Sequence, residues 1–384
     1  MGISIKRSQF IKPKLAISIY LFFTILLTSD LSQCFDFHIY HKIKLVVTSI
    51  LINEDPIDIV YGWLNGSDPV WNKAFQYLSK KHNIQMRKNN FDMRFIEGDE
   101  LRYSLRLIEM FAIHFIRYIF IIVPNTYTQI PCWLNTFHPK LKIISQRDIF
   151  TQTIPDEFQN DTNSIFIFNS NSIDNSIPSI PGLSDKFIYM NDDFFYGRKV
   201  EKSDFFDEEG RPKIFVNAHN FNNAENEYRR LSLTGKNDFS GTKFNAVLCG
   251  TVILMKNKLN TYSNLDSYHV SFPYTKRLWK EAMAIFGNEI NNTISSPFRN
   301  VTDVLFIALA LQYGLYKKQV IPVQFQLEDS RFVMISSSRS LNELELISKQ
   351  HPKVFCINCD NTDFVYKSQE FLSSYFPNKS SFEL

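Results

Sequence analysis

Two adjacent carboxylates and an amide follow an apolar run directly in the stretch KFIYMNDDFFYG, residues 186–197. Asn and Asp side chains hydrogen-bond to nearby backbone groups, so Asn191, Asp192 and Asp193 could form an ordinary turn after a buried strand. The same oxygen donors suit hard divalent cations such as Mg²⁺ or Mn²⁺. A plain turn and a metal site are therefore both compatible with these three residues.

His269 and Arg299 are two further side chains that could do chemistry. A neutral imidazole can accept a proton near neutral pH, so His269 is a candidate base, although a lone histidine is often structural. Arg299 can hold phosphate oxygens through its two-pronged guanidinium, or it can form a surface salt bridge with Asp303 one helical turn later. Each residue thus has a catalytic and a structural interpretation.

A second polar stretch, NGSD, follows an apolar run at residues 57–64. If that run is a strand, a nucleotide would dock at its carboxyl end, and a glycine there would permit close backbone approach. We therefore predict that Asn65, Gly66, Ser67 and Asp68 bind the nucleotide. Asn65 also lies in a glycosylation sequon, and because a glycan would block the site we expect it to be unmodified.

The five cysteines are too few for a disulfide scaffold. Cys356 and Cys359 form a single CxxC, whereas a structural zinc site usually needs a second pair. The pattern disfavours structural zinc and leaves open a local disulfide or two unpaired thiols.

The elements that must position these residues alternate along the chain. A helix-like pattern at 98–115 lies among strand-like runs at 57–65, 117–125, 140–145 and 186–191. Such alternation with apolar strands predicts a mainly parallel, Rossmann-like sheet covered by helices on both faces. Ligands bind at the carboxyl edge of such sheets, and that edge is where Asn191, Asp192 and Asp193 would lie.

The rest of the chain divides by pattern. An irregular loop is expected at about 218–243, a helical insertion at 246–314, and return strands in the C-terminal part. With 384 residues, 44% hydrophobic residues and a net charge of +3 from dispersed Lys and Arg, the composition indicates a globular protein without a nucleic-acid role. Its 12 glycines form neither GxGxxG nor a Walker motif.

The N-terminal region has the pattern of a targeting segment. Basic residues up to Lys14 precede an uncharged apolar run at 15–28, which fits a cleaved signal peptide or a retained type II anchor. We expect a signal or anchor segment and stem at 1–35 and a single catalytic domain at 50–384. The expected location is the secretory pathway, as a Golgi membrane protein with a luminal catalytic domain, or secreted if the segment is cleaved.

Four ordered blocks of the sequence resemble the Stealth family, which includes the lysosomal-enzyme N-acetylglucosamine-1-phosphotransferase α/β subunit and bacterial capsular-polysaccharide hexose-1-phosphate transferases. The blocks begin with DIVYGWLNGSDPVW and continue with RFIEGDELRYSLRLIEMFAIHF, which leads to IPGLSDKFIYMNDDFFYG. They end with HVSFPYTKRLWKEAM, followed by SSPFRNVTDVLF, and with PKVFCINCD. The resemblance spans about residues 57–384. The fold expected is α/β, with a mainly parallel Rossmann-like (GT-A-like) sheet flanked by helices.

The resemblance implies an enzyme that transfers a sugar-1-phosphate, such as N-acetylglucosamine-1-phosphate from UDP-N-acetylglucosamine, to a sugar hydroxyl on a glycan or glycoprotein. The nucleoside monophosphate leaves, and Mg²⁺ or Mn²⁺ is the cofactor. The expected partners are the nucleotide-sugar donor, the glycan or glycoprotein acceptor, the membrane through the N-terminal segment, and a second copy in a homodimer.

The resemblance also assigns roles to residues. The catalytic residues expected are Asp174, Asp192, His269 and Arg299. Asp192 and Asp193 would hold the metal. Asn191 and the pair Arg102 and Tyr103 would contact the donor, beside residues 65–68, whereas Arg106 could equally be solvated or form a bridge.

The chain departs from the family pattern at four positions, Gly62, Ser176, Pro178 and Cys359. Two alternatives to sugar-phosphate transfer follow. One is a metal-dependent glycosyltransferase that moves the sugar alone, and the other is an inactive, carbohydrate-binding family member.

Overall fold

The computed structural model describes residues 55–84, 95–150, 165–234, 241–324, 326 and 328–384. The chain separates into two compact units, Met1–Pro56 and Ile57–Leu384, and the second is described below. The predicted signal or anchor segment at 1–35 lies outside the described residues.

The central sheet of this unit has five strands in the order β3-β2-β1-β4-β8. Four strands are mutually parallel, and β8 pairs antiparallel with β4. The bounds are β1 Ile57–Gly62, β2 Ile116–Val123, β3 Leu141–Ser145, β4 Lys186–Asn191 and β8 Phe272–Thr275. The mixed α/β fold with a mainly parallel central sheet, as predicted, is confirmed.

The order of the strands creates a switch point between β1 and β4. From β1 the chain adds β2 and β3 on one side and later returns to add β4 on the other. The last residues of β1 and β4, Gly62 and Asn191, are direct partners in the pairing register. Crevices outside such a switch point are the usual ligand sites of open parallel sheets, so a ligand site is expected at the carboxyl ends of β1 and β4.

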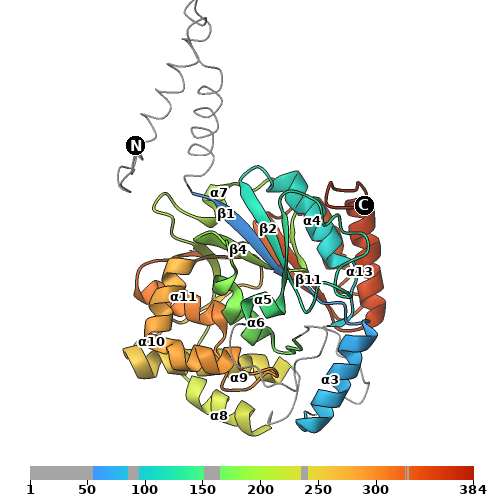
Figure 1. Ribbon diagram of the computed structural model, residues 1–384. Coiled ribbons are helices and arrows are strands. Elements are labelled where there is room, and N and C mark those ends of the chain that lie inside the picture. The colour runs from blue at the N-terminus through green and yellow to red at the C-terminus, as the bar shows by residue number, and fades with distance from the viewer. Residues whose placement is uncertain (1–54, 85–94, 151–164, 235–240, 325, 327) are drawn as a thin grey trace, which may run out of the picture. The chain divides into compact units, whose positions relative to one another are not determined.

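Helices surround this sheet, and Figure 1 shows α4 and α13 together at one side of it. The aromatic and apolar positions of α4 face inward, while Glu109 and Met110 lie toward solvent. The helices outside the insertion are α3 Pro69–Lys81, α4 Glu100–Phe111, α5 Gln146–Ile149, α6 Ser170–Ser176, the 3₁₀ turn η4 Ile177–Ser179, α7 Lys202–Phe205, α12 Asn342–Gln350 and α13 Thr362–Tyr375.

The predicted helical insertion is present as a group of four helices, which gather at the lower left of Figure 1. They are α8 Ala224–Thr234, α9 Gly241–Leu259, α10 Lys276–Ile294 and α11 Phe306–Tyr316. The expected irregular loop at 218–243 is instead partly helical. Glu225 and Glu227 lie in the first turn of α8, where acidic side chains oppose the positive end of the helix dipole.

Two smaller sheets complete the unit. One joins β10 Ser330–Ile335, β11 Val354–Cys359 and β5 Phe194–Tyr196, and the other joins β6 Lys213–Ala218, β7 Leu265–Ser267 and β9 Ile321–Gln324. The C-terminal return strands are therefore present. Their main consequence is that β11 pairs antiparallel with β5, directly beyond the Asp192-Asp193 turn.

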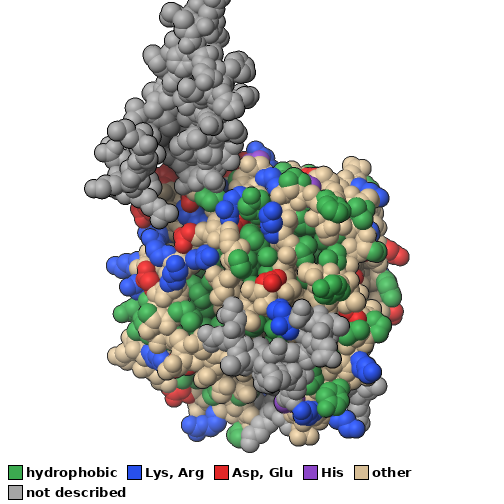
Figure 2. All heavy atoms as spheres, in the orientation of Figure 1, with side chains coloured by type: hydrophobic (Ala, Val, Ile, Leu, Met, Phe, Trp, Pro, Cys, Tyr) green, Lys and Arg blue, Asp and Glu red, His purple; other side chains and the backbone are tan. Residues whose placement is uncertain are grey.

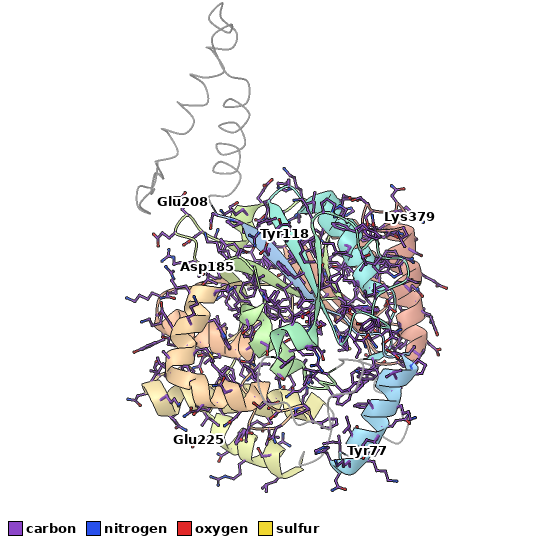
Figure 3. All side chains as sticks on the ribbon, in the orientation of Figure 1. Tyr77, Tyr118, Asp185, Glu208, Glu225 and Lys379 are labelled. Atoms are coloured by element: carbon purple, nitrogen blue, oxygen red, sulfur yellow. The ribbon has the colours of Figure 1, made fainter. Side chains whose placement is uncertain are left out.

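The face shown in Figure 2 carries Lys and Arg side chains dispersed among hydrophobic and acidic ones. Of the two tyrosines labelled in Figure 3, Tyr77 on α3 is exposed, whereas Tyr118 on β2 is half-buried against the core. Within the described ranges, no helix combines the length and the apolar character needed to cross a membrane.

Candidate active site

A cavity of about 420 Å³ opens at the carboxyl ends of β1 and β4. Its size lies within the usual range for small-ligand sites. The strand ends contribute Gly62, Trp63 and Leu64 after β1, and Asn191, Asp192 and Asp193 after β4. The walls come from the start of α4, from α6, from the segment before β8 and from the end of β11, so residues far apart in sequence share this pocket.

The Asn191-Asp192-Asp193 turn, between β4 and β5, lines the cavity. Asp193 accepts a hydrogen bond from Asn358 Nδ2 on β11 through Oδ2, at 2.5 Å. Its other oxygen, Oδ1, is buried without a hydrogen-bond partner among the described residues. Burial raises the pKa of both Asp192 and Asp193, and the Asp192 charge raises that of Asp193 further.

These features fit a divalent cation. A buried carboxylate oxygen without a donor, beside a second carboxylate that repels it, is an arrangement that bound positive charge would stabilise. The hard oxygen donors of Asp192 and Asp193 are those that Mg²⁺ and Mn²⁺ prefer. The two residues predicted as metal ligands are therefore suited to that role.

Glu97 and Glu100 also line the cavity, and the sequence reasoning did not identify them. Glu100 opens α4, and burial together with the Asp192 carboxylate raises its pKa well above the ordinary value. An acid in a first helical turn is explained by the helix dipole alone, which concealed its second role. Their position in FIEGDELRYS, within the block that resembles the Stealth family, could have identified them as candidate site residues.

His269 lies between β7 and β8, and its side chain reaches the cavity. Its ring makes edge-on contacts with three phenylalanines, at centroid distances of 5.0 Å to Phe194, 6.2 Å to Phe272 and 5.5 Å to Phe332. Burial lowers the pKa of His269 to about 4. The ring is therefore neutral at pH 7, although its pKa does not lie near that pH as the sequence argument assumed.

Arg299 and Asp174 face the same cavity from a different side. Arg299 donates to Ser170 Oγ on α6, at 2.5 Å. Asp174, also on α6, accepts from the buried hydroxyl of Tyr189 at 2.7 Å, and burial raises its pKa to about 7 although Arg299 opposes the shift. The structure thus brings together Asp174, Asn191, Asp192, Asp193, His269 and Arg299, as the sequence-based prediction requires.

Arg299 interacts with Asp303 through charge, since it opposes the raising of the Asp303 pKa by burial, but the hydrogen bonds of Asp303 come from other groups. Asp303 accepts hydrogen bonds from the backbone of Asn300 at 2.9 Å and from the side chains of Asn169 and Asn171 at 2.9 and 3.2 Å. These bonds hold the segment before α11 against α6, which leaves the Arg299 guanidinium beside Ser170 at the cavity wall.

The predicted nucleotide stretch at 65–68 does not line this cavity. Asp68 caps α3 by accepting from Val70 N at 2.8 Å, and it also accepts from Thr128 and Gln129. A Cβ on Gly66 would lie 2.0 Å from the Phe95 carbonyl oxygen, so the glycine makes room for this chain's own backbone. Asn65 and Ser67 bond to each other in the same turn. The contacts of these residues are those of helix capping and loop packing. The residues after β1 that line the cavity are Gly62, Trp63 and Leu64.

Arg102 and Tyr103 also lie away from the cavity lining. The Arg102 guanidinium lies over the Trp133 ring at 5.0 Å and bridges to Asp99 and Glu383. Tyr103 is buried in the core. The contacts of both residues in the structure are with other parts of the fold, so their role as donor contacts stays a prediction. Glu100 is the residue of α4 that lines the cavity.

Both cysteines of the CxxC are free thiols, so the disulfide alternative is wrong. They stand three residues apart on β11, and side chains at odd spacing on a strand point to opposite faces. Cys359 Sγ lies 3.1 Å from Ser368 Oγ of α13, whereas Cys356 is fully buried near Asp193.

Fold and site together define an α/β protein with an acidic, metal-suited pocket at the switch point of its sheet. Stealth protein CR2, conserved region 2, matches residues 94–214, which include both Glu100 and the Asp192-Asp193 turn. The similarity to the Stealth family that the sequence blocks predicted is confirmed over these residues.

Several relatives match over most of the chain. The capsular polysaccharide phosphotransferase fcs1 of Haemophilus influenzae is 28% identical over 348 residues, covering 87% of this chain and 88% of that protein. The exopolysaccharide phosphotransferases SCO6023 of Streptomyces coelicolor and CpsY of Mycobacterium tuberculosis are each 28% identical over 85% of this chain. The chain spans only 52% and 58% of the length of these two proteins. The prediction of a sugar-phosphate transferase enzyme is confirmed by this class of relatives.

Solved structures with a similar arrangement include two glycosyltransferases. The galactosyltransferase LgtC, in complex with donor and acceptor sugar analogs, has a TM-score of 0.39 at 11% identity, covering 84% of this chain and 96% of that chain. The bifunctional glycosyltransferase WbbM has a TM-score of 0.38 at 10% identity, covering 85% and 50%.

The predicted location as a Golgi type II membrane protein, or a secreted product of that pathway, is wrong. The relatives are bacterial enzymes, named for capsular or exopolysaccharide phosphotransfer. The expectation rested on the apolar run at 15–28 after basic residues, a pattern that targeting segments share and that does not by itself specify the Golgi.

Proposed function

We propose that this protein transfers a sugar-1-phosphate from a nucleotide diphosphate sugar to a hydroxyl group of a glycan, with release of the nucleoside monophosphate. The observation that carries the proposal is the convergence of Asp174, Asp192, Asp193, His269 and Arg299 on one cavity. These residues come from two separate sequence blocks. A purely structural role would not require acidic, imidazole and guanidinium groups to face one space at the sheet's switch point.

The relatives support the acceptor class. Their names describe phosphotransfer in capsular polysaccharide and exopolysaccharide, so a growing polysaccharide is the acceptor we propose here. N-acetylglucosamine-1-phosphate from UDP-N-acetylglucosamine is the donor group we propose on the family resemblance. We also propose that Ile57–Leu384 is the catalytic domain, whereas a homodimer stays a prediction.

The roles of the residues follow from their chemistry. Asp192 and Asp193 would hold Mg²⁺ or Mn²⁺, which supplies charge neutralisation for the diphosphate. Glu100 lies close enough to Asp192 for their charges to interact, and it adds negative charge to this side of the cavity. Arg299 can bind phosphate oxygens in a bidentate manner on the other side.

His269 and Asp174 are the groups available for proton handling and positioning. His269 is unprotonated at pH 7, so a ring nitrogen can accept a hydrogen bond from the attacking hydroxyl. Asp174 is held by Tyr189 and interacts electrostatically with Arg299, which orients the guanidinium toward the cavity. Reaction at the β-phosphorus leaves the bond between sugar and phosphate intact, so the phosphate travels with the sugar.

The test uses UDP-N-acetylglucosamine carrying radioactive phosphorus at the β position, Mg²⁺ or Mn²⁺, and a capsular oligosaccharide acceptor. We expect label in the acceptor and UMP as the nucleotide product. Asp192→Asn should lower the rate by about 100-fold or more, since loss of even an outer partner of a metal site costs about 10- to 100-fold. Asp360→Asn is the matched control, because Asp360 is exposed just after β11 and does not line the cavity.

Two results would contradict the proposal in different ways. Release of UDP with no label in the acceptor would show that the sugar moves alone, as in an ordinary glycosyltransferase. No turnover with any nucleotide sugar, together with metal-dependent binding of glycans in calorimetry, would indicate a carbohydrate-binding protein.

A further inference from the structure

A second type of ligand cluster lies within the same wall of the cavity. Asp193, His269 and Cys356 each offer one ligand atom, and these atoms lie within 4.8 Å of one another. The three residues come from three parts of the chain: the turn after β4, the segment before β8, and β11. Neither the CxxC spacing nor the acidic turn predicts this combination.

The fold holds the three side chains in place. Cys356 is the pairing partner of Phe194, the residue after Asp193, and Ile357 N donates to Asp193 O at 3.3 Å. The Phe332 backbone N–H donates to the hydroxyl of Tyr268 at 2.8 Å, which ties the neighbour of His269 to β10. Backbone pairing between strands therefore fixes the relative positions of the three residues.

The donor set differs from the one that Mg²⁺ prefers. A carboxylate, an imidazole and a thiolate together favour Zn²⁺, which is bound by Asp, His and Cys side chains in proteins. Three protein ligands with an open fourth position are typical of zinc sites that face a cavity. Asp193 and His269 line the cavity here, so a metal can enter from it and a water molecule can complete the tetrahedron.

The three ligand atoms must move closer together to bind zinc. Zinc bonds of about 2.0–2.3 Å imply ligand atoms roughly 3.5 Å apart, so the atoms would move together by about 1 Å. Asp193 Oδ1 is buried and has no hydrogen-bond partner of ordinary geometry among the described residues, and the Cys356 thiol interacts with the same carboxyl group, so a metal would take the place of the thiol proton between them. Asn358 Nδ2 donates to both Asp193 Oδ2, at 2.5 Å, and Cys356 Sγ, at 3.0 Å, and so orients two of the ligands.

We propose that Zn²⁺ binds to Asp193, His269 and Cys356 and thereby inhibits the transfer reaction. This regulatory role rests on the proposed function, because Zn²⁺ would take Asp193 from the Mg²⁺ or Mn²⁺ site and the ring nitrogen of His269 from the acceptor hydroxyl. On binding, the Sγ–Zn bond replaces the S–H bond of Cys356, and the proton passes to solvent. No change of oxidation state is involved.

The binding test uses Co²⁺ as a spectroscopic substitute for Zn²⁺ in the full-length chain. We expect one Co²⁺ per chain with thiolate-to-cobalt charge-transfer absorption, and displacement of this absorption by Zn²⁺. Cys356→Ser should abolish the absorption, while Cys359→Ser, three residues along the same strand but on its other face, should retain it. Equal absorption in the Cys356→Ser variant and the native chain would overturn the site.

A second variant guards against a folding defect in Cys356→Ser. His269→Ala should weaken Co²⁺ binding by at least about 10- to 100-fold but keep the thiolate absorption at saturating metal, because the sulfur ligand remains. Circular dichroism of each variant establishes that the chain is folded. Unchanged Co²⁺ affinity in folded His269→Ala would exclude the imidazole as a ligand and overturn the three-residue site.

The inhibition test measures transfer at fixed Mg²⁺ with increasing Zn²⁺, each variant relative to its own rate without Zn²⁺. We expect inhibition in the native chain and in Cys359→Ser, and at least a tenfold weaker response in Cys356→Ser. Stimulation by Zn²⁺, or equal inhibition of all three, would overturn the regulatory role. If no transfer occurs at all, the proposed function fails, while the Co²⁺ spectra still decide whether the site exists.

Discussion

Individual carboxyl groups in the cavity have pKa values that differ from their values in water. Asp174 is the clearest case, because its carboxyl is buried and hydrogen-bonded to Tyr189. Burial disfavours the charged form and raises its pKa to about 7, which exceeds the attraction of Arg299. Keeping this group charged at pH 8 therefore destabilises the folded state.

Replacement of Asp174 by Asn tests this cost. Between about pH 4 and pH 7 the folded state keeps a proton on Asp174 that the unfolded state has lost, so stability falls as pH rises through this window. Asp174→Asn should therefore be more stable than the native chain at pH 8, by about 2–4 kcal/mol, with the advantage disappearing near pH 4. Denaturant unfolding at pH 4, 6 and 8 measures the difference.

The activity of the same variant separates stability from function. If Asp174 positions Arg299, Asp174→Asn should transfer more slowly at pH 8 although it is more stable. A variant that is less stable by the same amount at every pH would contradict the buried, titrating carboxyl and indicate a simple packing defect.

At the scale of elements, the cavity depends on α4 being held in position by the C-terminal segment. Glu383 is almost fully buried, with a side chain 1% exposed, and it receives Arg106 Nε and Nη2 at 2.7 and 2.8 Å. Arg106 also donates to the Phe376 carbonyl, and Glu383 accepts from Ser380 N. This segment follows Lys379, which lies at the end of the chain beside α13 in Figure 3. Of the interpretations left open for Arg106, the structure shows the bridging one, an ion pair with Glu383.

Truncation of this bridge should destabilise the whole unit. Glu383→Ala leaves the Arg106 guanidinium without its carboxylate in a buried place, which costs about 3–5 kcal/mol. Arg106 and the other hydrogen bonds lower the pKa of Glu383 although burial opposes them, so its contribution is present above about pH 4.5 and is lost as pH falls below that value. Thermal or denaturant unfolding at pH 7 gives the magnitude.

A matched exposed acid provides the control for Glu383. Glu345 pairs with Lys349 on α12 at 3.4 Å, with both side chains largely exposed, so Glu345→Ala should change stability by less than about 0.5 kcal/mol. Equal effects of the two substitutions would mean that the C-terminal segment does not anchor α4.

At the scale of the whole molecule, the free energy of unfolding should depend on pH and on bound metal, because carboxylates are buried in the cavity. Asp192, Asp193 and Glu100 all have raised pKa values from burial, and repulsion between their charges adds to this for Asp193 and Glu100. Raised carboxyl pKa values mean that stability without metal decreases as pH rises from about 4 to 8. A bound divalent cation removes this repulsion, so its stabilising effect should be greatest at high pH.

Thermal unfolding with and without Mg²⁺ or Mn²⁺ tests this linkage. At metal concentrations about 100 times the dissociation constant we expect about 2.7 kcal/mol of stabilisation, a few degrees in Tm, at pH 8, and little at pH 5. Asp193→Asn should raise Tm without metal and remove the metal effect. The same metal-induced shift in native chain and variant would place the metal elsewhere.

Apolar patterns along the chain were sufficient to predict the main strands and helices and part of the site. Apolar runs at 57–62 and 186–191 became adjacent parallel strands, because buried strands in a parallel sheet need apolar side chains on both faces. The polar residues that end the second run therefore lie at the ligand edge, as expected. His269 and Arg299 were identified by block order and reach the same cavity.

Which polar residues face that cavity, and which stabilise the fold, depends on long-range packing that local patterns do not encode. NGSD looks like a binding loop in sequence, yet Asp68 caps α3 and Gly66 admits the Phe95 carbonyl, since buried backbone groups must find partners before a ligand can. Glu100 looks like a helix-dipole acid, yet α4 directs it to Asp192. Cys356 meets Asp193 and His269 because β11 pairs with β5, a long-range contact that no local pattern encodes.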